Sequence, residues 1–304
     1  MNPKLWIFLA LGVIAALFLV AWTRALRAGR AEGQGAALPT ARETAIGFGT
    51  NFFDTLGIGS YAPTTVLFRF FGLVPDERIP GTLTIGHALP TIVQAFIYIT
   101  IVEVELKTLV LLILAAVVGS WLGAGVVARW PRRTIQLGMG CALLAAAGLF
   151  ILKNLDEMRG APVFPGGEAL GLQGALLIGA LVGNFALGAL MTLGIGLYAP
   201  CLIMISLLGM SPKAAFPIMM GSCAFLMPLA SVRFLKAKAF SARPAIGLAL
   251  GGIPAVLIAA FIVKSLPLTA VRWLVVVVVL YAALGLLRAA RRSAPVPPAP
   301  PVVP

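Results

Sequence analysis

The chain has 304 residues, of which 60% are hydrophobic and only 11% are charged, and its mean hydropathy is +1.03. This composition excludes a soluble domain and predicts an integral membrane protein. The formal net charge is +13, but most basic residues gather in short clusters beside apolar segments, which indicates a role in membrane topology and not nucleic-acid binding. The clusters are Arg24, Arg27 and Arg30; Arg129, Arg132 and Arg133; Arg233, Lys236 and Lys238; and Arg288, Arg291 and Arg292.

Seven uninterrupted apolar segments are long enough for membrane spans, which need about 20 residues each. The first is expected to be a retained span and not a cleaved signal peptide, because its basic residues follow the apolar run. In chain order the segments are 5–23, 80–102, 108–128, 134–152, 214–232, 245–263 and 273–287.

Two longer apolar stretches, 44–71 and 172–208, are each interrupted by a copy of one octapeptide. LGIGSYAP begins at Leu56 and LGIGLYAP begins at Leu193, 137 residues later. The same offset pairs Thr55 with Thr192, Gly72 with Gly209, Pro75 with Pro212 and Pro80 with Pro217. The sequence therefore contains an internal duplication.

Each repeat is predicted to be a re-entrant helical hairpin followed by three transmembrane helices. Stretch 44–71 provides two arms of about 13 residues, each about 20 Å long, so the turn lies near the middle of the membrane. Hairpins that return to their side of entry place the cluster RWPRR, residues 129–133, with the other basic clusters. Three crossings after each hairpin then invert the second repeat, a signature of secondary transporters. Crossing of the membrane by the broken elements remains the alternative.

The fold class is therefore an all-α polytopic membrane protein with inverted repeats and one extra N-terminal transmembrane helix. Residues 1–43 form that helix and a basic cytoplasmic linker, 44–153 the first repeat, 154–170 an external loop and 171–288 the second repeat. Residues 289–304 form a proline-rich tail, which is expected to be disordered because it can neither continue a helix nor bury a core.

The octapeptides predict an anion site at the hairpin turns. Unpaired backbone is tolerated inside a membrane only where it lines a cavity, and Gly57 and Gly59 permit the positive φ of a tight turn. The second arm then points its N-terminus, with free N–H groups around Ala62, Thr64 and Thr65, at the middle of the membrane. Such a helix end attracts an anion. The alternative is that the glycines and prolines only allow close helix packing.

The substrate-binding candidates offer polar groups or close backbone approach near the two turns. They are Asn51, Thr55, Gly57, Gly59, Ser60, Tyr61, Thr64, Thr192, Gly194, Gly196, Tyr198, Cys201 and Ser222.

Asp54 and His87 are candidates for proton coupling, because ionisable side chains inside spans are commonly functional and histidine titrates near neutral pH. The alternatives are a hydrogen-bonded structural Asp54 and a packed His87. The second half carries no titratable counterpart of either residue at the offset of 137.

The paired glycine-rich broken elements, the PGT at residues 80–82 and the stretch VVGSWLGAGVVARW at 117–130 resemble the TauE/SafE sulfite exporter family of membrane permeases. The resemblance covers residues 44–287. It implies export of small sulfur-containing anions, such as sulfite, sulfoacetate or another organosulfonate, with the hairpin tips as the binding site.

The predicted function is secondary transport of such an anion across the cytoplasmic membrane by alternating access. A passive anion channel is an alternative, because half-helix dipoles also serve pores. A second is a transporter for thiosulfate or a related compound that contacts Cys201 and Cys223. The direction, the coupling ion and the presence of a homodimer stay open.

Enzyme, cofactor and metal functions are not expected. The single histidine leaves no HExxH motif and no Ser–His pair near a GxSxG motif. The three cysteines lack the CxxC spacing of a zinc site. The expected partners are the small anion and the lipid bilayer, with no nucleic acid.

Overall fold

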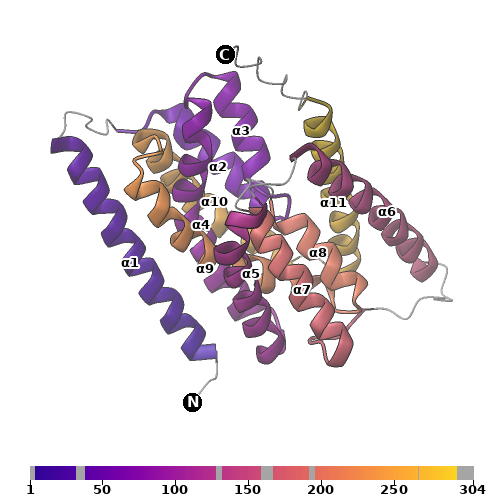
Figure 1. Ribbon diagram of the computed structural model, residues 1–304. Coiled ribbons are helices and arrows are strands. Elements are labelled where there is room, and N and C mark those ends of the chain that lie inside the picture. Colours follow the sequence, from indigo (N-terminus) through magenta and orange to yellow (C-terminus); the bar gives the residue numbers. More distant parts are fainter. Residues whose placement is uncertain are drawn as a thin grey trace, which may run out of the picture.

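A computed structural model describes residues 4–31, 38–127, 132–158, 167–191, 196–265 and 267–292. Throughout these residues the secondary structure is helical and contains no strand, apart from one isolated bridge between Ala169 and Met210. The chain is therefore an all-α protein, as its composition predicts (Figure 1).

The described residues contain the following helices in chain order. They are α1 (Lys4–Ala31), α2 (Ala41–Thr55), α3 (Tyr61–Phe70), the short 3-10 helix η1 (Asp76–Arg78), α4 (Ile79–Ile101), α5 (Leu106–Val127), α6 (Arg132–Met158), α7 (Gly174–Met191), α8 (Tyr198–Leu207), α9 (Pro212–Lys236), α10 (Ala242–Ser265) and α11 (Leu268–Arg292).

Five helices of the described chain are long and apolar enough to cross a membrane, which supports a multi-pass membrane protein. Four of them, in α1, α4, α9 and α10, match expected spans. The fifth is α7, whose 18 residues exceed the arms of about 13 expected for an interrupted stretch. Large apolar side chains such as Val182 and Phe261 remain exposed on the helices, as contact with lipid requires.

The arrangement of helices repeats with the sequence. Helices α3 and α8 have 10 residues each and begin 137 residues apart, at Tyr61 and Tyr198. Helix α2 packs along α10 and α7 packs along α5, while α4 packs on α9 and α6 on α11. Helix α1 lies at one edge of the bundle and the α6–α11 pair at the opposite edge (Figure 1).

Glycines bring the long helix pairs into backbone contact. A Cβ atom on Gly47 of α2 would lie 2.6 Å from the Cα of Leu248 in α10. A Cβ atom on Gly188 of α7 would lie 2.1 Å from the carbonyl oxygen of Ala116 in α5. Small residues therefore perform the packing role expected inside membranes, but these glycines lie outside the octapeptides.

In each interrupted stretch, residues at or just before the start of the first helix lie close to those that follow the second helix. The Arg42 guanidinium, in the first turn of α2, lies 4.8 Å from the centroid of the Phe71 ring, which follows α3. In the second stretch, Ala169 precedes α7 and exchanges backbone hydrogen bonds with Gly209 and Ser211, which follow α8, at 3.3 and 2.9 Å. In both cases the chain leaves the hairpin close to where it entered.

The open ends of the two hairpins lie at opposite ends of α4. The first hairpin leads through η1 directly into the N-terminus of α4. The second begins beside the C-terminus of α4, because the Glu105 N–H, four residues after that helix, donates to the Leu170 carbonyl at 2.7 Å. The ends of the two stretches therefore lie beside opposite ends of α4.

Candidate functional site

The first turn has the backbone that its glycines predict. Gly57 and Gly59 have φ values of +94° and +87°, in the region that favours glycine. The Gly57 N–H donates to the Asp54 carbonyl at 2.8 Å and closes the end of α2. A Cβ atom on Gly59 would meet no atom within 4 Å, so open space adjoins the turn there.

The predicted free N–H group at Thr64 is wrong. That group donates to the Ser60 carbonyl at 3.0 Å, as the helix hydrogen-bond pattern requires. The first N–H groups of an α-helix lack intrahelical partners, and in α3 these belong to Tyr61 and Ala62. The helix end available to a ligand is therefore shorter than the sequence interpretation assumed.

A chain of buried hydrogen bonds joins the two hairpins. Gln94 of α4 donates from Nε2 to Asp54 Oδ2 at 2.9 Å and to Thr55 Oγ1 at 3.0 Å. The Tyr198 hydroxyl donates to Gln94 Oε1 at 2.7 Å. Asp54 and Thr55 end α2, whereas Tyr198 begins α8. All four side chains are buried and cannot bond to water. Removing one of them would therefore leave a polar atom of its partner without a hydrogen bond.

Ser60 completes the surroundings of the Asp54 carboxylate from the first turn. Its hydroxyl and its backbone N–H both approach the carboxylate. The side chains of Tyr61, Tyr198 and Cys223 also lie near enough to interact with it. The described neighbours are thus neutral hydrogen-bonding groups and not cations.

His87 is held on both ring nitrogens. Its Nδ1 lies 3.0 Å from Asn51 Oδ1, and its Nε2 lies 3.1 Å from Thr64 Oγ1. The Asn51 amide nitrogen donates to the Gly47 carbonyl at 2.7 Å, so the oxygen faces the ring and Nδ1 carries the proton. The Thr64 hydroxyl donates its one proton to the Ser60 carbonyl at 2.7 Å. In this state it can accept from a charged ring, and it can donate to a neutral ring only by turning that proton away from Ser60.

Sequence reasoning missed a polar stripe on α4. Besides His87 it contains Thr84, Thr91, Gln94 and Tyr98, spaced by three or four residues as neighbours on one helix face are. The Tyr61 hydroxyl donates to Thr84 Oγ1 at 3.1 Å, and the Tyr98 hydroxyl donates to the Thr55 carbonyl at 3.2 Å. The periodicity of the stripe is the sequence feature that could have identified it.

The second hairpin contributes fewer of its predicted residues. Asn184 Nδ2 donates to the Leu112 carbonyl at 2.7 Å and to Ser222 Oγ at 3.1 Å, and its buried Oδ1 has no partner. Gly196 is exposed, and a Cβ atom there would meet nothing within 4 Å. Cys201 is buried in α8. Thr192 and Gly194 lie outside the described residues.

The predicted residues therefore separate into two groups. Asn184 and Ser222 form a local pair in the second half, whereas one network links the first turn, α4 and Tyr198 through hydrogen bonds of 2.7 to 3.1 Å. This network contains Asn51, Asp54, Thr55, Thr64, His87 and Tyr198, with Ser60 and Tyr61 beside it.

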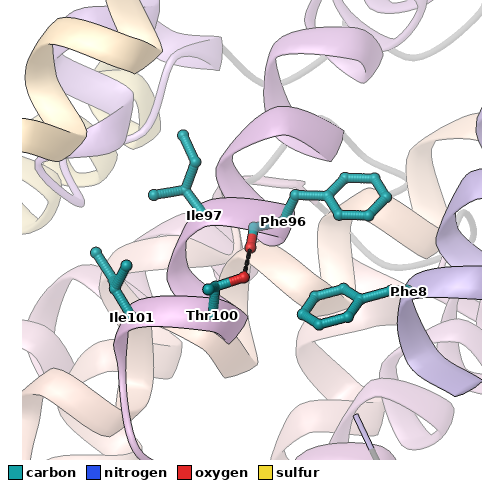
Figure 2. A pocket seen from close by; sticks show the side chains of 5 residues that line it. All are labelled: Phe8, Phe96, Ile97, Thr100 and Ile101. Carbon is teal, nitrogen blue, oxygen red and sulfur yellow. Dashed lines mark hydrogen bonds between the residues drawn. The ribbon is translucent and has the colours of Figure 1, made fainter. Parts of the chain in front are cut away.

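A hollow of about 530 Å³ lies away from this network, between α1 and α4 (Figure 2). Phe8, Phe96, Ile97, Thr100 and Ile101 line it, and the Phe8 and Phe96 rings stack with centroids 5.6 Å apart. The Thr100 hydroxyl donates to the Phe96 carbonyl at 2.7 Å. The hollow is therefore an apolar surface suited to lipid and unsuited to a small anion.

No protein-family model, curated protein or solved structure matches the chain. Any function must therefore be argued from the hairpins and from the network between them.

Proposed function

We propose that the chain is a secondary transporter that binds a small sulfur-containing anion between the turns of two inverted helical hairpins. The observation that carries this proposal is the buried chain Asp54–Gln94–Tyr198, which joins the two turns inside an apolar bundle. Polar and ionisable groups at this depth are costly and mark ligand or ion pathways. Interrupted helices that meet near mid-membrane are typical of secondary transporters.

The inverted repeat is part of the proposal and is supported by the packing. The hairpins open at opposite ends of α4. In the duplication α2 corresponds to α7 and α10 corresponds to α5, and the packed pair α2–α10 therefore has its equivalent in the packed pair α7–α5. By connectivity, the C-termini of α1, α9 and α11 and the N-terminus of α6 lie at the same end of the bundle. The basic clusters occur at these termini, so we assign that end to the cytoplasm.

The anion would bind to donors at the starts of α3 and α8. The free N–H groups of Tyr61 and Ala62 face it from one hairpin, and those of Tyr198 and Ala199 from the other, because Pro63 and Pro200 have none. Such fixed donors suit the compact oxygen cluster of a sulfite or sulfonate. The resemblance to the TauE/SafE family supports the sulfur chemistry of the substrate.

The test combines ligand-induced stabilisation with flux. Sulfite, sulfoacetate, isethionate and thiosulfate are added to the purified protein, with chloride and choline as controls, because a ligand that binds the folded state raises the melting temperature. In proteoliposomes, an unlabelled anion on the far side should accelerate uptake of the labelled anion. Uptake without this stimulation would indicate a channel, and the absence of any anion effect would refute the proposal.

Matched glycine variants locate the site. Gly196→Val should abolish the anion-induced stabilisation, whereas Gly179→Val, at a similarly open position on α7, should retain it. Gly59→Val is compared with Gly72→Val, because both positions have positive φ and open space but Gly72 lies at the hairpin base. If Gly196→Val and Gly59→Val both fold and bind the anion as wild type does, the octapeptides serve only helix packing.

A further inference from the structure

The carboxylate of Asp54 lies beside the start of α3, where the proposed function places the anion. Asp54 is the penultimate residue of α2, and its carboxylate is approached by the hydroxyl and N–H of Ser60, the residue that caps α3. Gln94 holds the same carboxylate from α4 at 2.9 Å. Ser60, the residue before α3, is thus already engaged by a carboxylate of the chain, next to the free N–H groups of Tyr61 and Ala62.

No cation of the described chain offsets this charge. The titratable groups that interact with Asp54 are Tyr61 of α3, Tyr198 of α8 and Cys223 of α9, and Tyr98 of α4 bonds the carbonyl of the adjacent Thr55. His87 is engaged by Asn51 and Thr64 instead. From α10, Arg243 binds Glu43 at 2.9 Å, eleven residues and about 16 Å along α2 from Asp54.

We infer that ionised Asp54 excludes the transported anion, so that the anion and one proton bind together. The inference rests on the proposed function. Two like charges a few ångströms apart in a buried site repel strongly, whereas a protonated Asp54 could still accept the Gln94 hydrogen bond through its carbonyl oxygen. Protonation would therefore release the start of α3 for the substrate without breaking the chain to Tyr198.

Thermodynamic linkage makes the effect reciprocal. If a proton raises the affinity for the anion, the anion raises the affinity for the proton by the same factor. The consequence is proton uptake on anion binding, with symport of the two species. Ser60 then serves the carboxylate and the substrate in turn, as one leaves and the other arrives.

The test uses calorimetric titration with isethionate and methanesulfonate, whose charge is constant across the pH range. Titrations run from acidic to alkaline pH in buffers with different ionisation enthalpies, which yields the number of protons taken up per anion. For the full-length protein we expect affinity to fall by up to about tenfold per pH unit where Asp54 ionises, with uptake approaching one proton.

Four variants identify the group responsible. Asp54→Asn should bind the sulfonates with pH-independent affinity and without proton uptake, and Asp54→Glu should restore the pH dependence. Glu103→Gln, an exposed carboxylate outside the network, should behave as wild type. His87→Gln should retain proton uptake, and loss of uptake in this variant alone would overturn the assignment to Asp54.

The outcomes separate the inference from the function on which it rests. Wild-type binding that is pH-independent and takes up no proton overturns the inference and leaves the transporter proposal intact. Proton uptake that persists in folded Asp54→Asn also overturns it. If sulfonates and sulfite fail to bind both wild type and Asp54→Asn at every pH, the proposed function itself is refuted.

Discussion

At the scale of single residues, Gln94 is the side chain on which the contact between the hairpins depends. Its amide donates two hydrogen bonds and accepts one, and the three partners are 40, 39 and 104 positions away in sequence. An amide fits this position because it can donate to the carboxylate of Asp54 and accept from the hydroxyl of Tyr198 at once. Leucine would fill similar space and could do neither.

Gln94→Leu should therefore destabilise the protein by several kcal/mol, because each buried partner left unsatisfied costs about 1–3 kcal/mol. The control is Thr100→Val on the same helix, whose hydroxyl bonds only its own helix backbone and whose loss should cost much less. Thermal unfolding in detergent measures both. Equal melting temperatures for the two variants would show that the hydrogen bonds of Gln94 between the two hairpins do not stabilise the protein.

His87 permits a direct test of the hydrogen-bond assignment, because it is the only histidine in the chain. Nitrogen NMR of histidine-labelled protein should give one ring spectrum in which Nδ1 carries a proton, since Asn51 Oδ1 can only accept. Asn51→Leu should remove this preference. A neutral ring protonated at Nε2 in wild type would contradict the assigned network.

At the scale of helices, the glycines divide into those that shape turns and those that bring backbones together. Gly57 and Gly59 adopt positive φ, whereas Gly188 has an ordinary helical backbone and lies against Ala116. Close packing thus explains Gly188 and Gly47 but not Gly57 and Gly59. The two roles predict different consequences of adding a single methyl group.

Gly188→Ala should lower stability by about 1–3 kcal/mol, because its new methyl group would lie 2.1 Å from a backbone oxygen of α5. Gly179→Ala, on the same helix α7 but facing open space, should be neutral or stabilising by up to about 1 kcal/mol. Melting temperatures of the pair provide the measurement. A neutral Gly188→Ala would mean that α5 and α7 are less closely packed than described.

The sequence predicted these elements where local chemistry determines them. Positive φ at Gly57 and Gly59 follows from the octapeptide itself, and the spans of α1, α4, α9 and α10 follow from hydropathy. The sequence did not predict the role of Gln94, because its partners are distant in sequence. A single amide in an apolar run does not show which residues it will contact. The stripe it shares with His87 becomes meaningful only once α4 is known to face both turns.

At the scale of the whole molecule, the proposed hairpins predict which loops share a side of the membrane. Arg42 and Glu77 flank the first hairpin, and Glu168 precedes the second. In a version without Cys141, which is exposed, single cysteines at Arg42 and Glu77 should react with an impermeant reagent from the same side as one at Lys236. A cysteine at Glu168 should react from the opposite side. Labelling of Arg42→Cys and Glu77→Cys from different sides would refute the hairpin topology.

The polar stripe of α4 has no equivalent in α9, although the two helices occupy corresponding places in the duplication. The positions 137 residues after the stripe are Gly221, Ala224, Pro228, Ser231 and Leu235, and Ser231 bonds only the Met227 carbonyl of its own helix. In an inverted-repeat transporter, the inward- and outward-facing states arise when the halves exchange conformations. For the transporter proposed above, this exchange would break contacts that the other half cannot remake, so the two states would differ in free energy and the empty protein would rest facing one side.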